Sequence, residues 1–362
     1  MKNSAIKWVI VRSTSGVSEP RYRNILVQLE HLQVTTGQIT WERKSKANIK
    51  TAHRSINQFY LETPFGLGKK NTLNHLRFQI HIWKQLQSIV PDVVYSCDLD
   101  TFLISAFWAR SHHRKVVFDQ FDPISSRFSS RLQKFFDLLE DKISRLANLR
   151  ISANTDRNRN KDSWVALPNF FPIEVPKKST PSKDKILFYG GVIQPDRGLV
   201  EVAEFLGKVG DWKFLVFGDG PDFNSLRNIA ERYSNIYIHH SIDHGYLMEL
   251  ASQSSIFLAL YDPAKPHNQF TSSNKLYEAT QLKIPIITTK GTQIGRDVEQ
   301  FNLGWTIDYN SISQFTSVLA ERSLWSQMDF FQFEKRCRAF LEDCNYEKLL
   351  NNYRRSIAQL VV

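Results

Sequence analysis

Short apolar runs alternate with amphipathic stretches along the first half of the chain. The apolar runs predict buried strands at four places: residues 6–11, 92–95, 115–118 and 149–152. The amphipathic stretches predict helices at three places: residues 21–32, 101–110 and 126–147. A longer helix precedes the second of these strands, and apolar residues at helical spacing mark its expected inner face: Leu73, Leu76, Ile80, Trp83 and Leu86. This alternation is typical of βαβ units, which build parallel sheets.

The same pattern restarts after a segment that reads as a linker. Residues 174–184 contain two prolines, three lysines and no aromatic residue. Strands are then predicted over residues 185–189, 213–217, 235–238, 256–261 and 285–288, and helices over residues 199–209, 224–233, 245–252 and 274–281. We therefore expect a Rossmann-like domain over residues 1–178, a second over 179–340, and a C-terminal helix over 341–362 that packs on the first domain.

Composition supports a folded protein of two domains. The 362 residues are 42% hydrophobic and 23% charged, which excludes a disordered or low-complexity chain. The apolar run that follows Lys7 is too short for a spanning helix, which needs roughly 18 apolar residues, and it lacks a secretory cleavage site. Three cysteines do not form a disulfide framework, so a reducing, cytoplasmic compartment is expected, with the thiols packed against the core. They are Cys97, Cys337 and Cys344.

The positive charge is concentrated in the first half. Residues 1–178 contain 28 Lys and Arg against 15 Asp and Glu, whereas residues 179–362 contain 19 against 21. The first half is therefore expected to meet an anion: nucleic acid, an anionic membrane or a phosphorylated acceptor. Arg127, Arg131 and Lys134 recur at helical spacing and form the candidate face, for which a solvated helix surface is the alternative.

Two segments of the second half are candidates for binding an anion. In the first, a buried strand ends at Gly190 and Gly191, where the missing side chains allow close approach to the backbone, and Arg197 follows at the start of a helix. A tight turn with a solvated arginine is the alternative. The Gly218–Gly220 turn contains only half of a dinucleotide fingerprint, so we interpret it as a turn.

The second segment, residues 271–278, opens a helix with hydroxyl and amide side chains. Ser273 and Asn274 lie at its positive end, Lys275 adds a charge in the first turn, and Glu278 lies one turn later, where it can accept hydrogen bonds from vicinal hydroxyls. The alternative is a helix cap beside a surface ion pair. The ten histidines show no metal-ligand spacing, and we expect structural or solvated roles for them, His244 included. We interpret Asp98 and Asp100 as the polar start of a helix.

Together these segments resemble glycosyltransferase family 4, and the similarity runs over nearly the whole chain. Residues 18–21, 94–101, 117–122 and 167–170 are similar to four family motifs in the first domain. In the second domain, residues 190–198 resemble the family's phosphate loop, and residues 274–278 with 284–287 resemble its Asn-Lys-Leu-Phe-Glu and Pro-Val-Ile motifs. The resemblance implies a GT-B fold, with two Rossmann-like domains facing across a cleft.

It also implies roles for particular residues. Arg197, Lys275 and Glu278 would be the catalytic set: the two cations neutralise a diphosphate and the carboxylate holds the ribose. The donor site would further include Gly16, Asp122, Gly190, Gly191, Ser273, Asn274 and Leu276. The acceptor or membrane side would include Arg21, Arg127, Arg131 and Lys134. No metal or other cofactor is expected. The chain departs from the family at Phe270, in place of a glutamate, and at Phe121, in place of a histidine.

The resulting hypothesis is a retaining, metal-independent hexosyltransferase of the cytoplasm, peripheral on the inner face of the cell membrane. It would transfer a sugar from a nucleoside diphosphate to a glycan or polyprenyl-linked glycan acceptor, as in O-antigen or capsule synthesis, and no nucleic acid partner is expected. One alternative is a protein that binds nucleotide sugar or nucleic acid without catalysis. Another is a nucleotide-sugar epimerase of the same fold.

Overall fold

The computed structural model describes residues 7–14, 20–42, 56–61, 69–127, 130–153, 155, 158, 160–167, 169, 184–265, 268–269 and 273–360. The chain divides into two compact units. Unit 1 contains Met1–Pro168 and Glu347–Val362, and unit 2 contains Asn169–Tyr346. The observed division therefore precedes the expected one after residue 178, and the returning segment begins at Glu347 rather than at residue 341. The expected linker lies outside the described residues, apart from Asp184.

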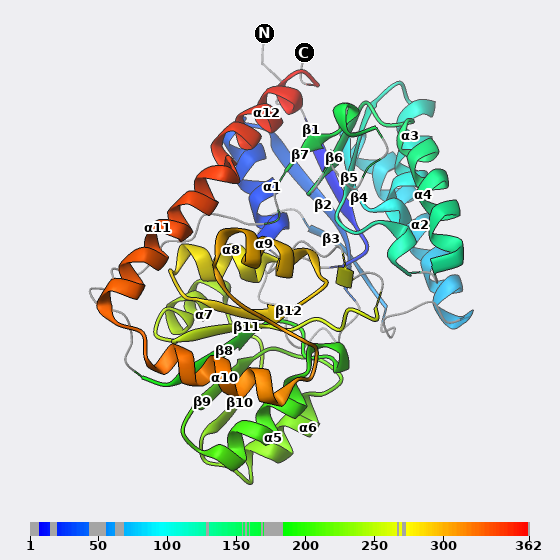
Figure 1. Cartoon of the computed structure of the whole chain (residues 1–362). Coiled ribbons are helices and arrows are strands. Elements are labelled where there is room, and N and C mark those ends of the chain that lie inside the picture. Colours follow the sequence, from blue (N-terminus) through cyan, green and yellow to red (C-terminus); the bar gives the residue numbers. More distant parts are fainter. Residues whose placement is uncertain are drawn as a thin grey trace. The chain divides into compact units, whose positions relative to one another are not determined.

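Unit 1 is built on one parallel sheet of seven strands (Figure 1). Its order is β3-β2-β1-β4-β5-β6-β7, so β1 pairs with both β2 and β4. The strands are β1 (Lys7–Arg12), β2 (Thr35–Glu42), β3 (Ile56–Tyr60), β4 (Val93–Cys97), β5 (Lys115–Gln120), β6 (Leu149–Ser152) and β7 (Val165–Ala166). Strand β4 is buried along its whole length, as the near-continuous apolar runs of a parallel sheet require.

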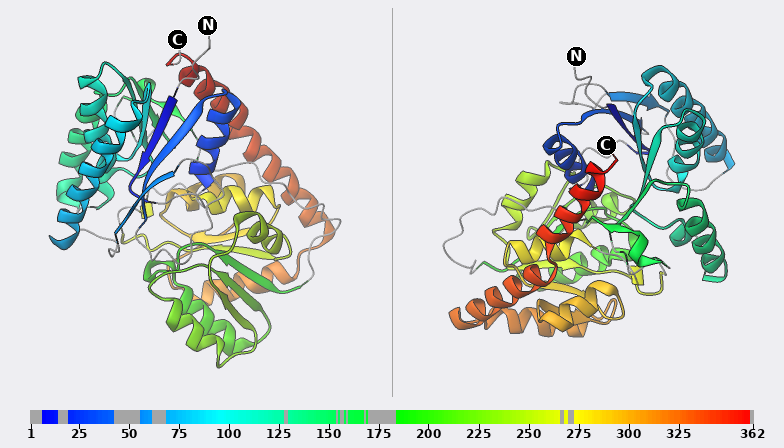
Figure 2. Two further views of the ribbon diagram at one scale, coloured as in Figure 1. Left: turned by 180° about the vertical axis from the view of Figure 1, so that it is seen from behind. Right: turned by 90° about the horizontal axis from the view of Figure 1, so that it is seen from above.

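The helices of unit 1 cover both faces of its sheet. In a right-handed crossover, the direction in which the chain moves along the sheet decides which face the connecting helix covers. The chain moves one way from β1 to β2 and the other way from β4 to β7, so the helices of these two parts lie on opposite faces. One face carries α1 and the C-terminal α12, and the other carries α2, α3 and α4 (Figures 1 and 2). The helices are α1 (Pro20–His31), α2 (Lys69–Ile89), α3 (Leu99–Ser111), α4 (Ser130–Ser144) and α12 (Tyr346–Ala358), with 3₁₀ turns η2 (Ile124–Arg127) and η4 (Lys161–Ser163).

The predicted inner face of α2 is only partly right. Leu86 is buried and Trp83 packs against the core, as predicted, but Leu73, Leu76 and Ile80 are exposed, and Phe78 and Ile82 are buried instead. Both sides of this helix carry large apolar residues at spacings of three and four, so periodicity alone does not identify the buried side. The ring of Phe78 decides the packing, because it lies against Trp41 of β2, 5.2 Å between ring centroids.

Unit 2 repeats the design on a parallel sheet of six strands, in the order β10-β9-β8-β11-β12-β13. The strands are β8 (Ile186–Gly190), β9 (Lys213–Phe217), β10 (Ile236–His239), β11 (Ile256–Ala259), β12 (Ile286–Thr289) and β13 (Gly304–Ile307). The helices are η5 (Pro195–Arg197), α5 (Leu199–Val209), α6 (Phe223–Ala230), α7 (His244–Ala251), α8 (Asn274–Gln281), α9 (Gln293–Phe301), α10 (Ile312–Ser323) and α11 (Gln327–Asp343).

Two apolar clusters hold the helices of unit 2 on the faces of its sheet. Leu199, Leu226 and Phe315 bring α5, α6 and α10 into one cluster, and α7, α8, α9 and α11 share the other. Cys337 belongs to the second cluster and Cys344 packs against it, as expected for thiols that serve as small apolar groups. No helix among the described residues combines the length and the apolar character needed to cross a bilayer.

The alternation of strands and helices is confirmed, and the exceptions have local causes. Strands β2 and β3 were not expected, since polar residues interrupt their apolar positions. The helix expected over residues 126–147 is observed as η2 and α4, with residues 128–129 between them outside the described part. Strand β13 and helices α9 to α11 had no sequence prediction.

Candidate functional site

The strand order of unit 2 reverses between β8 and β11. In a parallel α/β sheet, ligands bind beyond the carboxyl ends of the strands at this switch point, where the two loops diverge and leave a crevice. Strand β8 ends at Gly190, and β11 continues into Leu260 and Tyr261. Helix α8 begins soon after β11, so the two segments selected from the sequence meet here within unit 2.

Gly191 and Lys275 are in direct contact at this point. The backbone of Gly191 has a φ of +142°, and a Cβ added to it would lie 2.8 Å from the Lys275 Nζ. The glycine is therefore needed both for its backbone conformation and for the space that the ammonium group occupies. Its amide, expected to be available to a phosphate, instead donates to the Phe217 carbonyl oxygen (2.9 Å).

The ammonium group of Lys275 lies among aromatic rings. Its Nζ is 5.0 Å from the ring centroid of Tyr189, a cation–π contact. Burial acts to lower the pKa of Lys275, but Tyr261, Tyr189 and Glu278 outweigh it, so the pKa lies above its ordinary value. The side chain therefore carries a full positive charge at the end of β8.

Arg197 is the second cation of this site, and other side chains hold it in place. Its Nη1 donates to the Asp196 Oδ2 (2.9 Å) and to the Asn268 Oδ1 (3.2 Å), and its guanidinium lies 4.4 Å from the ring centroid of Tyr261. The buried Asn268 also donates to Asp196 (2.8 Å), which closes the network. These contacts fix the guanidinium plane, so little side-chain entropy is lost when it binds an anion.

Glu278 follows Lys275 by one turn of α8 and has a partner that we did not expect. The His244 Nε2 lies 2.9 Å from the Glu278 Oε1, and both side chains are largely buried. Among the described residues, no group hydrogen-bonds the second oxygen, Oε2. His244 therefore orients the carboxylate and leaves Oε2 able to accept a hydrogen bond from a ligand hydroxyl.

The start of α8 completes the group. The Ser273 Oγ accepts from the Lys275 amide (3.2 Å) and lies 2.6 Å from the Tyr261 hydroxyl, which fixes the first turn. The Asn274 Oδ1 is buried and has no hydrogen-bond partner among the described residues. Buried acceptors are nearly always satisfied, so this oxygen suits a ligand donor. Leu276 is buried in the core beneath α8, so it supports the site through packing.

The glycine-containing loop after β9 packs against the loop of Gly191 and so supports the site. A Cβ on Gly218 would lie 1.8 Å from the Gly191 carbonyl oxygen, so only glycine allows the two loops to pack together. Asp219 of this turn lies 2.6 Å from the His240 Nδ1, and the His240 ring stacks on Phe223. Residues 218–220 belong to the loop between β9 and α6.

The sequence analysis missed Tyr189, Tyr261, Asn268 and the role of His244. Tyr189 reads as one more apolar residue of a buried strand. Only its place near the carboxyl end of a switch-point strand signals that its ring lies beside the candidate site.

In unit 1, Arg21 does not lie on an acceptor or membrane surface, and that expectation is corrected. Its guanidinium is buried, where it pairs with Asp119 and donates to the Leu167 carbonyl oxygen. Burial alone lowers the pKa of Arg21, but Asp119 more than compensates and raises it. The Tyr95 hydroxyl donates to the other oxygen of Asp119 (2.6 Å), so this ion pair belongs to the core.

Phe121, noted in the sequence analysis as a departure from the motif that this segment resembles, lies between two cations. Its ring centroid is 4.6 Å from the Arg12 guanidinium carbon and 4.8 Å from that of Arg21. The next residue, Asp122, is exposed, and its amide donates to the Asp98 Oδ1 (3.1 Å). Asp98 has φ +64° and ψ 163°, a strained conformation for a residue other than glycine.

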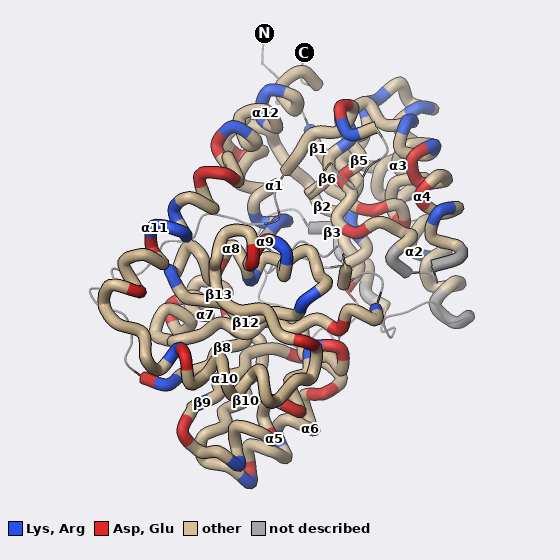
Figure 3. Tube along the Cα trace, viewed as in Figure 1, with Lys and Arg blue, Asp and Glu red and all other residues tan. Residues whose placement is uncertain are grey.

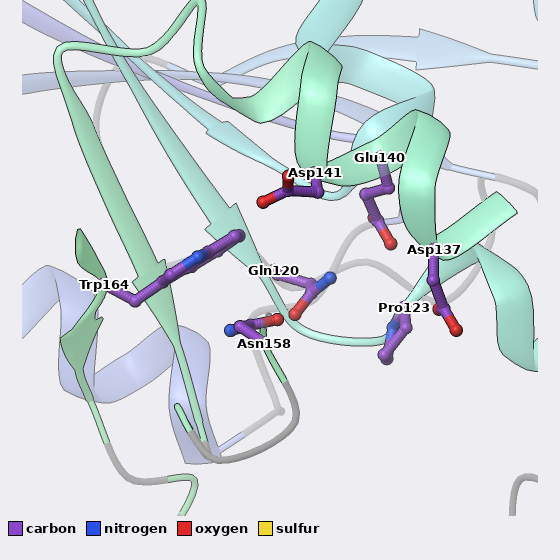
Figure 4. Close-up of a pocket in the computed structure, with 7 residues that line it drawn as sticks. All are labelled: Gln120, Pro123, Asp137, Glu140, Asp141, Asn158 and Trp164. Carbon is purple, nitrogen blue, oxygen red and sulfur yellow. The ribbon is translucent and has the colours of Figure 1, made fainter. Parts of the chain in front are cut away.

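A small polar pocket lies on the inner side of α4 (Figure 4). It encloses about 30 Å³, the room of a water molecule or two. Its walls combine carboxylates, amides and one aromatic ring: Asp137, Glu140, Asp141, Gln120, Asn158, Pro123 and Trp164. Asp141 is also paired with Arg145 (2.8 Å).

Several expected site residues have no described side chain. Gly16 and Phe270 lie outside the described residues, and the side chains of Arg127 and Arg131 are not described either. Lys134 is exposed on α4. No group of three or more His, Cys, Asp or Glu residues in the described part of the chain could hold a metal ion.

Comparison with known families finds a match in the second half of the chain. Residues 171–321 match the family model described as glycosyl transferases group 1. This stretch includes Gly191, Arg197, Lys275 and Glu278. A comparison with curated proteins found no match.

Solved structures resemble the chain over almost its whole length. The apo form of the lipopolysaccharide outer core galactosyltransferase WaaB is 14% identical, with a TM-score of 0.59 over 98% of this chain and 99% of that one. HepE from Anabaena, in complex with UDP-glucose, is 13% identical, with a TM-score of 0.70 over 97% and 99%. Sucrose-phosphate synthase from Thermosynechococcus elongatus is 12% identical, with a TM-score of 0.64 over 98% and 99%. The chain therefore has the GT-B fold, and its residues 171–321 are similar to the glycosyl transferases of group 1.

Proposed function

We propose that this protein is a retaining glycosyltransferase. It transfers a hexose from a nucleoside diphosphate sugar, bound by unit 2, to a glycan or lipid-linked glycan acceptor, bound by unit 1. The observation that carries the proposal is the pair of cations Lys275 and Arg197 at the switch point of unit 2, beside Gly191 and one turn from Glu278. The match of residues 171–321 to the group 1 family supports it.

The two cations suit the main electrostatic task of sugar transfer. When the bond between the sugar and the diphosphate breaks, negative charge grows on the departing phosphate oxygens. Lys275 and Arg197 are held in place before the ligand arrives, so they stabilise that charge without reorganising. Because they supply the positive charge, we propose that the reaction needs no metal ion. Activity in the presence of EDTA tests this point.

Glu278 and His244 suit the recognition of the nucleoside. A carboxylate whose Oε1 is held by His244 presents Oε2 to a ribose hydroxyl in a fixed direction. The unpaired Asn274 Oδ1 adds an acceptor at the start of the same helix. HepE, one of the similar structures, contains bound UDP-glucose, which supports UDP as the first nucleotide to test.

A similar structure and the distribution of charge support the proposal for the acceptor. WaaB, another similar structure, is a lipopolysaccharide galactosyltransferase, which favours an acceptor from surface polysaccharide synthesis. The excess of positive charge in residues 1–178 suits the pyrophosphate of a lipid-linked acceptor. We further propose a peripheral location on the inner face of the cell membrane. Retention implies attack on the same face of the sugar as the leaving group, and the anomeric configuration of the product, read by NMR, tests it.

Calorimetric titration with UDP, GDP, dTDP and CDP, without added metal, tests the donor site. We expect one nucleotide to bind tightly. Arg197→Ala and Lys275→Ala should weaken that binding about tenfold or more, as expected for the loss of a charged hydrogen bond. The matched control is Arg227→Ala, an exposed arginine of α6 in the same unit. It should leave the affinity unchanged.

Inorganic pyrophosphate separates the two halves of the site, because it lacks the ribose and the base. The variants Arg197→Ala and Lys275→Ala should weaken the binding of pyrophosphate and of nucleotide alike. Glu278→Ala and His244→Ala should weaken the binding of nucleotide alone, and His244→Gln should restore part of that affinity through its amide donor. If Glu278→Ala weakens the binding of pyrophosphate by the same factor, Glu278 does not bind the ribose.

Gly191→Ala tests the contact between the two segments. The added Cβ would occupy the position of the Lys275 Nζ, so nucleotide affinity should fall. Gly210→Ala is the control, since Gly210 also has a positive φ but no atom within 4 Å of the added Cβ. Failure of all four nucleotides to bind the unmodified protein would contradict the proposed donor site.

A further inference from the structure

Helix α4 exposes a stripe of apolar residues to solvent and turns the carboxylate of Glu140 inward, the reverse of the usual arrangement in a surface helix. Leu132, Phe135 and Leu139 are exposed, Phe135 by 60%. On the opposite side Glu140 is buried and lines the small pocket with Asp137 and Asp141 (Figure 4). Covering the sheet does not require this apolar stripe, so the outer side of α4 is suited to an apolar partner.

The two neighbouring helices have the same character. On α2 the exposed residues are Leu73, Leu76 and Ile80, and on α3 they are Leu103 and Phe107, the last exposed by 66%. The partly buried Trp83 links the two helices, with its ring centroid 5.8 Å from that of Phe107. Half of the large apolar side chains exposed in the described part of the chain therefore lie on α2, α3 and α4, which form one layer of unit 1 (Figures 1 and 2).

Basic residues are interspersed with these apolar ones. The exposed cations of the layer are Arg77 and Lys84 on α2, Arg110 on α3, and Lys134 and Lys142 on α4 (Figure 3). Helix α2 contains no Asp or Glu at all, and the carboxylates in the middle of α4 line the pocket on its other side. The outer side of the layer thus combines apolar and positive groups. We call it the three-helix face, defined by these five cations and the exposed apolar residues of α2, α3 and α4.

We propose that the three-helix face binds an anionic membrane surface. Its apolar side chains would enter the boundary between headgroups and acyl chains, and its Lys and Arg would contact lipid phosphates. Charge argues against a second copy of the chain as the occupant. A symmetric dimer through this face would bring positive groups against positive groups. This inference names the surface that the proposed peripheral glycosyltransferase would bind, and its role in the cell rests on that proposed function.

Vesicle flotation of the full-length protein tests the proposal. The vesicles contain phosphatidylcholine alone or phosphatidylcholine with phosphatidylglycerol, at low and high salt. We expect binding only to the anionic vesicles, weakened by salt. The triple variant Lys84→Gln, Lys134→Gln, Lys142→Gln should lower the partition coefficient roughly a hundredfold, since each cation near the surface contributes about fivefold. The double variant Phe107→Ser, Phe135→Ser should lower it by about tenfold or more.

Matched variants of unit 2 control for general changes in charge and hydrophobicity. Lys208→Gln, Lys213→Gln, Lys335→Gln removes three exposed lysines, and Leu324→Ser, Phe331→Ser removes two exposed apolar side chains. Neither control should change flotation. Equal losses in the controls, or no flotation of the unmodified protein, would overturn the proposal. A dimer in light scattering that Phe107→Ser, Phe135→Ser dissociates, without vesicle binding, would overturn it too and assign the face to a second copy.

Nucleotide titration of the same variants separates this inference from the proposed donor site. The residues of the three-helix face belong to unit 1, so the variants should bind nucleotide as the unmodified protein does. Urea unfolding of the variants checks separately that unit 1 is folded. Flotation that behaves as expected in a protein that binds no nucleotide would support the membrane surface and contradict the donor site alone.

Discussion

Asp98 illustrates how a single residue can oppose the stability of the fold around it. Its Oδ1 accepts hydrogen bonds from the amides of Phe121 (2.8 Å) and Asp122 (3.1 Å), and the residue is partly buried. Burial first, and then the nearby Asp100 and Asp122, raise its pKa well above the ordinary value of 3.8. The folded chain therefore keeps a proton on Asp98 at pH values where the unfolded chain has released it.

Asp98→Asn tests the consequence for stability. Between the ordinary and the raised pKa the folded state binds more protons than the unfolded state, so the free energy of unfolding decreases as pH rises through this window. Asparagine keeps the acceptor oxygen without ionising. We expect the variant to be more stable than the unmodified protein near neutral pH, with the difference shrinking on acidification. Urea unfolding between about pH 4 and 8 measures it.

The control for this prediction is Asp137→Asn, which alters an exposed carboxyl group in the same unit. It should follow the unmodified protein across the pH range. Parallel pH curves for Asp98→Asn and the unmodified protein would show that Asp98 ionises alike in the folded and unfolded states.

At the scale of the elements, α2 shows what a periodic pattern of apolar residues can predict: it indicates the helix but not which of its sides is buried. Apolar residues lie on both sides of this helix, and three of the five that the sequence analysis selected, Leu73, Leu76 and Ile80, are exposed in the structure. The buried side is chosen by the aromatic packing of Phe78 against Trp41, residues that lie on different elements. A local pattern contains no information about such a contact.

Two apolar residues of α2 test the corrected orientation. Ile82→Ala should lower the free energy of unfolding by about 2–5 kcal/mol, because Ile82 is fully buried and a cavity remains. Leu76→Ala should change it by less than about 0.5 kcal/mol, because Leu76 is exposed. Urea unfolding of both variants gives the two values. A larger loss for Leu76→Ala would restore the face expected from the sequence.

At the scale of the whole molecule, the chain returns to its first unit at the end. Helix α12 follows unit 2 in the sequence but packs in unit 1. Its Tyr353 is fully buried, and the Tyr353 hydroxyl donates to the Tyr95 hydroxyl (3.3 Å), which leads to Asp119 and Arg21. On the same helix the Arg354 Nε donates to the Gln28 Oε1 of α1 (2.8 Å). The last helix is therefore part of the core of unit 1.

Tyr353→Ala tests whether the two units can be perturbed separately. It should destabilise unit 1 by about 3–5 kcal/mol, as for the loss of a large buried ring. The affinity of unit 2 for its nucleotide should not change. Urea unfolding and nucleotide titration of the same sample measure both quantities, with the exposed Phe331→Ala as the control. A fall in nucleotide affinity comparable to the loss of stability would show that the site depends on unit 1.

The sequence by itself determined the alternating strands and helices, the division into two Rossmann-like units and the two segments that meet at the end of β8. Each of these follows from short-range rules: the period of apolar residues, glycine at the end of a strand, and hydroxyl residues at the start of a helix. The predictions therefore succeeded for elements with a clear local pattern, whereas β2, β3, β13 and α9 to α11 had no prediction.

The tertiary structure alone decided the partners of the charged residues. Arg21 is 98 residues from Asp119, and His244 is 34 residues from Glu278. The same holds for the rings of Tyr189 and Tyr261 around the cations, and for the side of α2 that meets solvent. Whether a charge is buried in a pair or available to a ligand depends on which distant residues the sheet brings beside it, and no local pattern encodes that.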